Sequence, residues 1–364
     1  MLCLDRGLVK PDSTQAGDIS TGVVFMPDIE IGSLRDPLRQ RMGVEFIEHL
    51  APLGSRMVLE TNSREVLDAC RTSFGRYGNC AYPTDEPLIK VRLLVDPDFG
   101  ETAPWPDPVF RCQRSTFYVS VGRQNTAVAS LDDGTVVGFI SPAMAREPTL
   151  LRKTFLDGPV LTLLTHGSRG RYAYLHASAV AFEGKGLLFA GPNESGKSTL
   201  AYACARSGFD FVSDDVVYLR QTEGGLAAWG RPWHLRLLLP ALRLFPELSH
   251  LDRKSESAEE VIEIEMEGIL PGRCRTRCEP AALVFLMRSE GAPSFRPLEA
   301  DEAMERLSSD LMYDVPEALE RHRRHWLELS RRGTYLLRCG TDLDSLTSLV
   351  RTFVGARRGA ASPA

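Results

Sequence analysis

The first 146 positions show a mixed pattern that ends in runs of alternating apolar and polar residues. The segment STFYVSVGRQNTAVASLDDGTVVGFIS, residues 115–141, contains three short alternating runs typical of half-buried strands. Asp132-Asp133-Gly134 joins the last two runs and predicts a hairpin turn. Earlier, residues 36–54 (DPLRQRMGVEFIEHLAPLG) have the apolar spacing of a helix. We therefore predict a smaller α+β domain over residues 1–146.

From residue 147 onward the pattern changes to strands that alternate with helices. Residues 148–167 (PTLLRKTFLDGPVLTLLTHG) predict a helix with an apolar stripe, broken at Gly158-Pro159. Further strands are predicted at YAYLHASAVAF, GLLFAG, FDFVSDDVVYLR, LVFLM and TYLLRCG, and further helices at STLAYACARSG, 301–332 and LDSLTSLVRTFV. This alternation predicts an α/β domain over 147–364 that folds without residues 1–146.

Composition narrows the class of protein. Of the 364 residues, 43% are apolar and 25% are charged, as in globular proteins, and the net charge is −5. An acidic balance gives no support for nucleic acid or an anionic membrane as a partner. No apolar run approaches the roughly eighteen residues of a membrane span, and MLCLDRGLVKPDSTQ is not a secretory signal. We expect a cytoplasmic protein whose eight scattered cysteines are free thiols.

The sequence GPNESGKST, which follows the apolar run GLLFA, satisfies the pattern of a phosphate-binding loop. Such a loop turns successive backbone N–H groups toward phosphate oxygens, and glycine allows the close approach. Lys197 is expected at the β- and γ-phosphates, with the Ser198 hydroxyl on Mg²⁺. Glu194 is expected to point to solvent. We predict that ATP contacts Gly191, Pro192, Asn193, Glu194, Ser195, Gly196, Lys197, Ser198 and Thr199.

Two adjacent carboxylates, Asp214 and Asp215, follow the apolar residues FDFV, 17 and 18 positions after Lys197. If this strand lies beside the loop strand, its carboxyl end faces the γ-phosphate. One carboxylate could then hold Mg²⁺ and the other accept a proton from an attacking hydroxyl. The alternatives are a solvated turn and a magnesium aspartate without a kinase role. His176, 21 residues before Lys197, is expected on a strand that pairs with the loop strand.

The segment from Leu175 to Arg220 resembles the catalytic domain of HPr kinase/phosphorylase and related serine kinases. The histidine, the loop lysine and the aspartate pair have the same spacing there; residues 147–364 resemble the family more loosely. The resemblance implies a P-loop fold, ATP, Mg²⁺ and transfer of the γ-phosphoryl group to a serine hydroxyl. It implies catalytic roles for His176, Lys197 and Asp215, metal binding by Ser198 and Asp214, and assembly as a homo-oligomer.

The sequence also departs from this family. Its metal-binding glutamate has no acidic counterpart in WGRPWHLRLLLP, and its dephosphorylation loop is matched only by LPGRC, residues 270–274. In that match Arg273 is the candidate phosphate or substrate contact. We therefore expect a kinase that acts on a protein, peptide or small molecule other than HPr. The alternative is an inactive nucleotide-binding regulator. Residues 1–146 are expected to recognise the target or to pack against the kinase domain.

Two further segments have open interpretations. The helix around residues 318–333 places arginines and histidines close together, as a solvated surface or as a docking face for an acidic substrate. Trp229 and Trp233 follow the aspartates and could belong to the core or form a wall of the substrate site.

Overall fold

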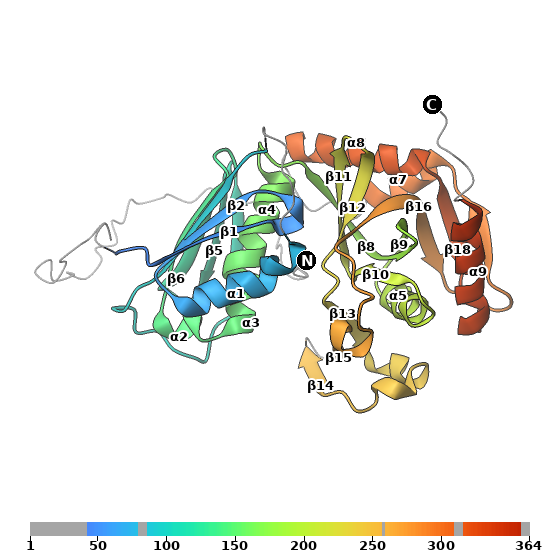
Figure 1. Ribbon diagram of the computed structural model, residues 1–364, viewed down its shortest axis with the longest axis horizontal. Coiled ribbons are helices and arrows are strands. Elements are labelled where there is room, and N and C mark those ends of the chain that lie inside the picture. The colour runs from blue at the N-terminus through green and yellow to red at the C-terminus, as the bar shows by residue number, and fades with distance from the viewer. Residues whose placement is uncertain (1–41, 79–85, 257–258, 309–315, 358–364) are drawn as a thin grey trace, which may run out of the picture. The chain divides into compact units, whose positions relative to one another are not determined.

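The structure, a computed structural model, describes residues 42–78, 86–256, 259–308 and 316–357 (Figure 1). All elements named below belong to the unit Val44–Ala364; the chain's other unit is Met1–Gly43. Within the described residues, the strands form three sheets of seven, eight and three strands. Parallel and antiparallel neighbours occur in the two larger sheets, so the fold is of the mixed α/β kind.

The seven-stranded sheet is built from residues 46–140 and has the order β1-β2-β3-β7-β6-β5-β4. Its strands β2, β3 and β7 are parallel, and the other neighbours are antiparallel. The strands are β1 (Phe46–Leu50), β2 (Met57–Thr61), β3 (Ile89–Val95), β4 (Val109–Gln113), β5 (Thr116–Val121), β6 (Asn125–Ser130) and β7 (Thr135–Ile140).

Two sequence predictions about this sheet have different outcomes. The hairpin turn before β7 is confirmed, and Gly134 has the positive φ of 71° that such a turn requires. The helix predicted over residues 36–54 is wrong in its described part, which forms strand β1. Pairing with β2 and the alternation of exposed and half-buried side chains along Phe46–Leu50 outweigh the helical spacing. Residues 36–41 lie outside the described part of the chain.

Helices cover one face of the seven-stranded sheet (Figure 1). The helical elements are η2 (Pro52–Gly54), α1 (Arg64–Phe74), η3 (Gly75–Tyr77), α2 (Pro142–Ala145), α3 (Pro148–Leu151), the π-helical turn η4 (Arg152–Asp157) and α4 (Gly158–His166). Ser63 caps α1 by accepting a hydrogen bond from Val66 N. The predicted break at Gly158-Pro159 is absent, because the wider turn of η4 leads directly into α4.

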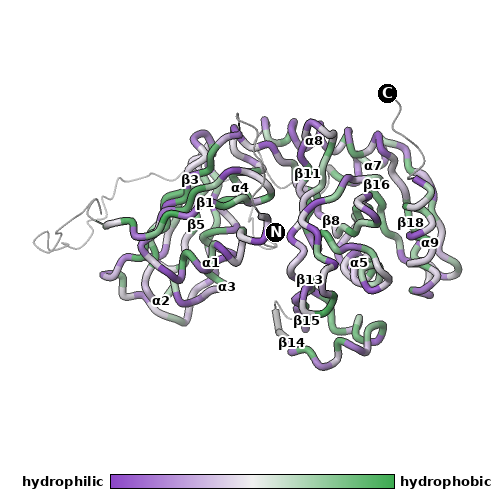
Figure 2. Tube along the Cα trace, in the orientation of Figure 1, coloured by the Kyte–Doolittle hydropathy of each residue, from purple (hydrophilic) through white to green (hydrophobic). Residues whose placement is uncertain are grey.

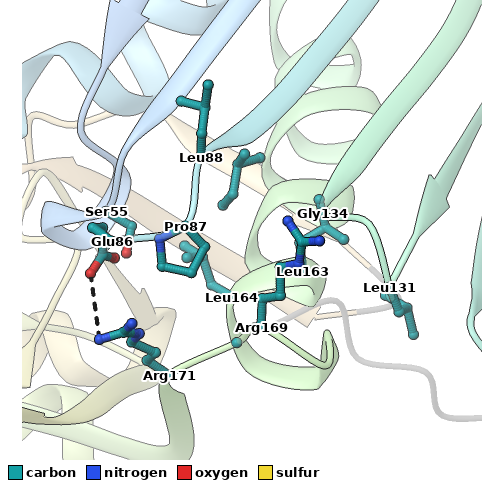
Figure 3. Close-up of a pocket in the computed structure, with 12 residues that line it drawn as sticks. Ser55, Glu86, Pro87, Leu88, Leu131, Gly134, Leu163, Leu164, Arg169 and Arg171 are labelled. Atoms are coloured by element: carbon teal, nitrogen blue, oxygen red, sulfur yellow. Dashed lines mark ion pairs between the residues drawn. The ribbon is translucent and has the colours of Figure 1, made fainter. Parts of the chain in front are cut away.

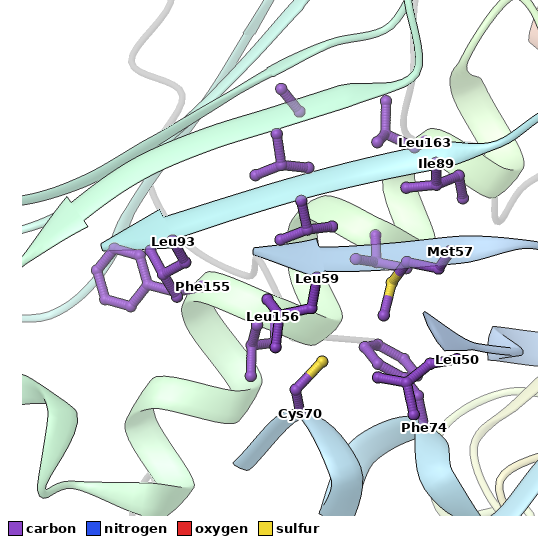
Figure 4. Close-up of a cluster of buried hydrophobic side chains, with 14 of the residues drawn as sticks. Leu50, Met57, Leu59, Cys70, Phe74, Ile89, Leu93, Phe155, Leu156 and Leu163 are labelled. Atoms are coloured by element: carbon purple, nitrogen blue, oxygen red, sulfur yellow. The ribbon is translucent and has the colours of Figure 1, made fainter. Parts of the chain in front are cut away.

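The core under this sheet joins side chains that are distant in the sequence. Figure 4 shows Leu59 on β2 facing Cys70 of α1 and Leu156 of η4. The same buried cluster includes five aromatic residues from later in the chain: Tyr172, Tyr174, Tyr218, Trp229 and Trp233. Both tryptophans therefore belong to the core, 5% and 4% exposed. The domain boundary between residues 146 and 147 stays a prediction, and residues 148–166 pack in the core of the first sheet.

The eight-stranded sheet carries the residues singled out in the sequence. Its order is β10-β8-β11-β12-β16-β18-β17, with β9 between β8 and β16. The strands are β8 (Tyr172–Phe182), β9 (Lys185–Ala190), β10 (Asp210–Ser213), β11 (Val216–Thr222), β12 (Gly225–Trp229), β16 (Arg277–Met287), β17 (Ser294–Pro297) and β18 (Thr334–Arg338). The apolar stretches of Figure 2 run along these central strands.

Helices pack on both faces of the eight-stranded sheet. Helices α5 (Lys197–Arg206) and α9 (Leu343–Ala356) contribute to one buried cluster, and α7 (Ala300–Ser308) and α8 (Pro316–Arg331) to another. The helix predicted over 301–332 is described in two segments, α7 and α8, and residues 309–315 between them lie outside the described part. Arg321, His322 and His325 of α8 are buried, so the proposed charged docking face does not contain them.

A three-stranded antiparallel sheet, in the order β13-β15-β14, completes the described structure. It consists of β13 (His234–Leu238), β14 (Arg253–Glu256) and β15 (Glu259–Glu265), with the short helices η5 (Leu239–Arg243), η6 (Pro246–Leu248) and α6 (Met266–Ile269) beside them. Leu235 and Ile264 from this sheet are fully buried in the same cluster as α5. This packing brings β13 close to the end of β10.

Candidate functional site

The phosphate-loop sequence lies between strand β9 and helix α5. Strand β9 ends at Ala190 and α5 begins at Lys197, so the motif has the strand-loop-helix context that it requires. Gly196 has a φ of 98°, and a Cβ added there would meet no atom within 4 Å. Backbone conformation therefore explains the glycine. Glu194 has a φ of 61°, and its side chain is exposed as expected.

Lys197 is held inside its own loop. Its side chain is buried, and Nζ donates hydrogen bonds to Gly191 O at 2.9 Å and Pro192 O at 3.0 Å. Ser195 Oγ is also buried and has no hydrogen-bond partner among the described residues. The loop thus presents an ammonium group and an unsatisfied hydroxyl at the start of a helix, where partial positive charge favours an anion.

Asp214 connects the end of β10 to the loop. Its Oδ1 accepts hydrogen bonds from Ser198 Oγ at 2.7 Å and Ser178 Oγ at 3.0 Å. Its Oδ2 accepts a hydrogen bond from the backbone N–H of Arg236 at 3.0 Å. Burial raises the pKa of Asp214 above its usual value, although these hydrogen bonds oppose the shift.

Asp215 points to a different partner. His176 Nδ1 lies 3.1 Å from Asp215 Oδ1, and the Asp215 side chain is 47% exposed. The pKa of Asp215 is lowered overall from its usual value: burial raises it, but the hydrogen bond and the charge of His176 act in the opposite direction. One carboxylate of the pair is therefore bound to the loop, and the other is half-exposed beside a histidine.

The two carboxylates diverge because the backbone turns between them. The sequence FDFVSDDVVYLR was predicted to be one strand, but β10 ends at Ser213 and β11 begins at Val216. Asp215 has a φ of 68°, and Val216 N donates to Asp214 O at 2.8 Å. This left-handed residue ends β10 and reverses the chain, so that Val216 pairs with His176.

The strand arrangement corrects one step of the sequence argument. The aspartate strand does not pair with the loop strand: β10 and β9 both pair with β8, which lies between them and runs antiparallel to each. The expectation that the histidine strand pairs with the loop strand is confirmed. Because β9 and β10 both run antiparallel to β8, their carboxyl ends reach the same edge as the middle of β8.

The structure brings most of the predicted site residues together and leaves one apart. Lys197, Ser198, Asp214, Asp215 and His176 are linked by the contacts above, directly or through the loop. Arg273 donates instead to Gly208 O at 2.9 Å, beyond the far end of α5. A ten-residue helix is roughly 15 Å long, so Arg273 does not reach the loop of its own chain.

Sequence reasoning missed Ser178 and the backbone of Arg236 as partners of Asp214. Ser178 could have been found, because it lies two residues after His176 on the same strand and therefore shares its face. Arg236 acts through its N–H group, and its position depends on the packing of β13 beside β10. No sequence signal indicates that contact.

Two cavities in the described residues lie away from the loop. The first, of about 20 Å³, has room for about one water molecule and is shown in Figure 3 beside the ion pair of Glu86 and Arg171. The second, of about 230 Å³, is lined by Arg76, Pro232, Trp233, Glu267, Cys274 and Thr276. In the same part of the chain, no helix is both long and apolar enough to cross a membrane.

Comparisons with known proteins add little to this geometry. No protein-family model matches the sequence, and no curated protein matches it. Among solved structures, a neighbour is the "Hpr(Ser) kinase/phosphatase from Coxiella burnetii", with a TM-score of 0.29 and 14% identity. The match covers 51% of this chain and 99% of that chain. A TM-score of this size does not establish a shared fold, so the function proposed below rests on the site.

Proposed function

We propose that this protein is a Mg·ATP-dependent kinase with a P-loop domain that transfers the γ-phosphoryl group to a serine hydroxyl. The observation that carries the proposal is that the two adjacent aspartates have different contacts. Asp214 is joined to the loop serine Ser198 at 2.7 Å, and Asp215 lies half-exposed, 3.1 Å from His176. In protein kinases one carboxylate holds the metal and another accepts the proton of the substrate hydroxyl.

The residues at the loop fit a nucleotide and its metal ion. A carboxylate oxygen and a hydroxyl are the hard oxygen ligands that Mg²⁺ prefers, and Ser198 and Asp214 supply one of each. The described residues contain no group of three or more His, Cys, Asp or Glu side chains arranged for a metal. Mg²⁺ commonly binds through one or two carboxylates together with substrate phosphates and water. When bound, the metal ion neutralises charge that develops on the phosphates.

Lys197 and the loop backbone would bind the phosphates. The Lys197 ammonium is held by Gly191 O and Pro192 O, so its charge is directed into the loop. Phosphate oxygens would replace these carbonyl acceptors, and Ser195 Oγ would gain a partner. The exchange would require small movements, because Lys197 and Ser195 both lie in the loop that would surround the phosphates.

Asp215 would act as the proton acceptor. In the transfer step, the serine oxygen forms a bond to the γ-phosphorus, and the bond to the β–γ bridging oxygen breaks, so that ADP leaves. The hydroxyl proton passes to the Asp215 carboxylate. His176, with its proton on Nδ1, would donate to Asp215 Oδ1 and hold the carboxylate toward the acceptor. The acceptor is a serine of a protein or peptide, or the hydroxyl of a small molecule.

A second candidate function is a regulator that binds ATP without transferring phosphate. One observation favours it: among the described residues, the metal ligands identified at the loop are one carboxylate and one hydroxyl, Asp214 and Ser198. Such a protein would bind Mg·ATP and change its affinity for a partner, but label would never reach a hydroxyl.

Calorimetry with ATP, with and without Mg²⁺, followed by transfer of labelled γ-phosphate tests both candidates. The acceptors are serine-containing peptide mixtures and the products of neighbouring genes, and Lys197→Ala is the matched inactive control. Phosphoserine formed by the wild type and not by the variant supports the kinase. Tight Mg·ATP binding without transfer to any acceptor supports the regulator. Absence of ATP binding overturns both.

A further inference from the structure

The segment from Trp229 to Trp233 lies directly against the strand that carries the aspartates. A Cβ added to Gly230 would lie 1.9 Å from Val212 O, so the two backbones touch where only glycine fits. One residue later, Arg231 N donates to Ser213 Oγ at 3.4 Å. The position of this segment therefore constrains the end of β10.

Ser213 passes the constraint to the aspartate turn. Its hydroxyl donates to Val216 O at 2.5 Å and so spans the turn that contains Asp214 and Asp215. Ser213 is fully buried. A shift of Arg231 would move this hydroxyl and loosen the turn from which both carboxylates project.

On its other side, Arg231 is anchored to the helices beneath the seven-stranded sheet. Its guanidinium forms an ion pair with Asp157, the last residue of η4. The Asp157 side chain is 8% exposed, and Arg231 is 28% exposed. Asp157 Oδ1 has no hydrogen-bond partner among the described residues, which leaves the pair dependent on the geometry of Oδ2 alone. π-helical turns such as η4 are frequent at functional sites.

Two further contacts hold the same segment from the same side. Tyr77 Oη donates to Gly230 O at 3.0 Å, and its ring packs edge-on against Trp233 at 5.2 Å. A Cβ on Gly54 would lie 2.6 Å from the ring of Trp229. Residues 229–233 thus lie between strand β10 on one side and η2 and η3 on the other.

We infer that Arg231 and Asp157 are positioning residues whose ion pair sets the geometry of the Ser213–Val216 turn, and hence the Mg²⁺ affinity of the site. This inference rests on the proposed function. It also gives η4 a role, which is to support the turn that carries Asp214 and Asp215. Partners that hold the ligands of a metal typically change its affinity by about 10- to 100-fold when they are removed.

A second buried ion pair provides a matched control. Arg220 on β11 pairs with Glu86, whose side chain is 2% exposed, just before β3. Like the pair of Asp157 and Arg231, it joins a residue packed with the seven-stranded sheet to a residue of the eight-stranded sheet or the segment after it. Its guanidinium contacts Tyr172 Oη and Ser55 Oγ, neither of which belongs to the 213–216 turn.

The test compares Asp157→Asn and Arg231→Lys with Glu86→Gln in the full-length protein. The measurements are the Mg²⁺ concentration for half-maximal ATP binding by calorimetry, amide hydrogen exchange across residues 210–220, and the melting temperature. We expect the Mg²⁺ requirement to rise about 10- to 100-fold in the first two variants, with faster exchange in the turn. Glu86→Gln should lower the melting temperature and leave both other readouts unchanged. Asp157→Glu, which keeps the carboxylate, should recover part of the affinity.

The outcomes separate this inference from the proposed function. If the wild type does not bind ATP, the proposed function fails, and the exchange of residues 210–220 alone decides the positioning role. Unchanged Mg²⁺ dependence and exchange in a folded Asp157→Asn protein would overturn the inference, as would equal changes in Glu86→Gln. Should Asp157→Asn not fold, Arg231→Lys, which retains the charge but loses the planar donors, decides the question.

Discussion

Ser178 and Ser198 donate hydrogen bonds to the same oxygen of Asp214, Oδ1. Ser178 lies on strand β8, and Ser198 lies at the start of helix α5. The two donors have different consequences. Ser198 is the residue that the proposed metal would share with Asp214, whereas Ser178 lies on β8 and is fully buried. Ser178 therefore stabilises the half-buried Asp214 carboxylate from strand β8.

Ser178→Ala should destabilise the protein, and more at neutral than at acidic pH. Burial raises the pKa of Asp214, so the folded state binds this proton more tightly than the unfolded state. The carboxyl's contribution to stability is then greatest at low pH and is lost as pH rises through the folded pKa. Removing a donor to the charged form strengthens this trend, at a cost of about 1–3 kcal/mol above that pKa.

Urea unfolding of Ser178→Ala at pH 7.5 and pH 4.5 checks this expectation. Ser330→Ala is a suitable control, because Ser330 is buried but its Oγ has no hydrogen-bond partner in the described part of the chain. An equal loss of stability at both pH values would show that Asp214 is not the group concerned.

Substitution of Asp215 and substitution of Asp214 should have different effects on kcat and on the Mg²⁺ requirement. Asp215→Asn should keep Mg·ATP binding largely intact while lowering kcat by about 10²- to 10⁴-fold, the range typical of a lost general base. Asp214→Asn should raise the Mg²⁺ requirement, because the Asp214 carboxylate shares a hydrogen bond with the loop serine Ser198. Calorimetry and single-turnover transfer measure the two effects. Normal transfer by Asp215→Asn, with no transfer by Asp214→Asn at saturating Mg²⁺, would exchange the two roles.

Two buried histidines should make the fold sensitive to acid. His166 and His322 lie with ring centroids 5.6 Å apart, between α4 and α8. Burial lowers the pKa of His166 to about 3 and that of His322 to about 4. The unfolded chain binds these protons at higher pH than the folded one, so stability is lost as pH falls from about 6.5 toward 4.

The expected slope is about 1.4 kcal/mol per pH unit for each histidine. His322→Gln should reduce the slope of unfolding free energy against pH, whatever it does to stability at pH 7.5. His250→Gln, at an exposed position, should leave the slope as in the wild type. If His322→Gln leaves the slope of unfolding free energy against pH unchanged, the acid sensitivity comes from other groups.

Local patterns predicted much of the second sheet. Strands β8, β9, β16 and β18 and helices α5 and α9 lie where apolar periodicity places them, because each buries one face or both. The glycine spacing of the phosphate-loop sequence predicted a strand before it and a helix after it, as found. Gly208, with a φ of 100°, ends α5 as expected.

Features that depend on tertiary contacts could not be predicted. Strand β1 is a strand because β2 pairs with it, and the division of β10 from β11 depends on the single left-handed residue Asp215. The contact of Arg236 N–H with Asp214 joins residues 22 positions apart on different sheets. No periodicity encodes such a contact. The roles of the site residues stay predictions until they are measured.

Deletion of residues 1–146 is expected to give an insoluble or unfolded product, although composition predicted a domain that folds without them. Tyr172, Trp229 and Trp233 are at most 5% exposed and share a buried cluster with side chains of β1 to β7. Removing that sheet would expose these aromatic rings and leave Arg220 without Glu86. Burying one large aromatic side chain contributes roughly 1.5–3 kcal/mol, so three of them represent much of a typical domain's stability.

A shorter deletion separates this effect from general truncation damage. Removing residues 1–41 leaves every described element intact and should give a soluble protein whose melting temperature stays within a few degrees of the wild type. Circular dichroism, sedimentation and calorimetric ATP binding on both truncated proteins make the comparison. A soluble 147–364 fragment with native ATP affinity would show that the packing of Trp229 and Trp233 against the seven-stranded sheet is dispensable for the nucleotide site.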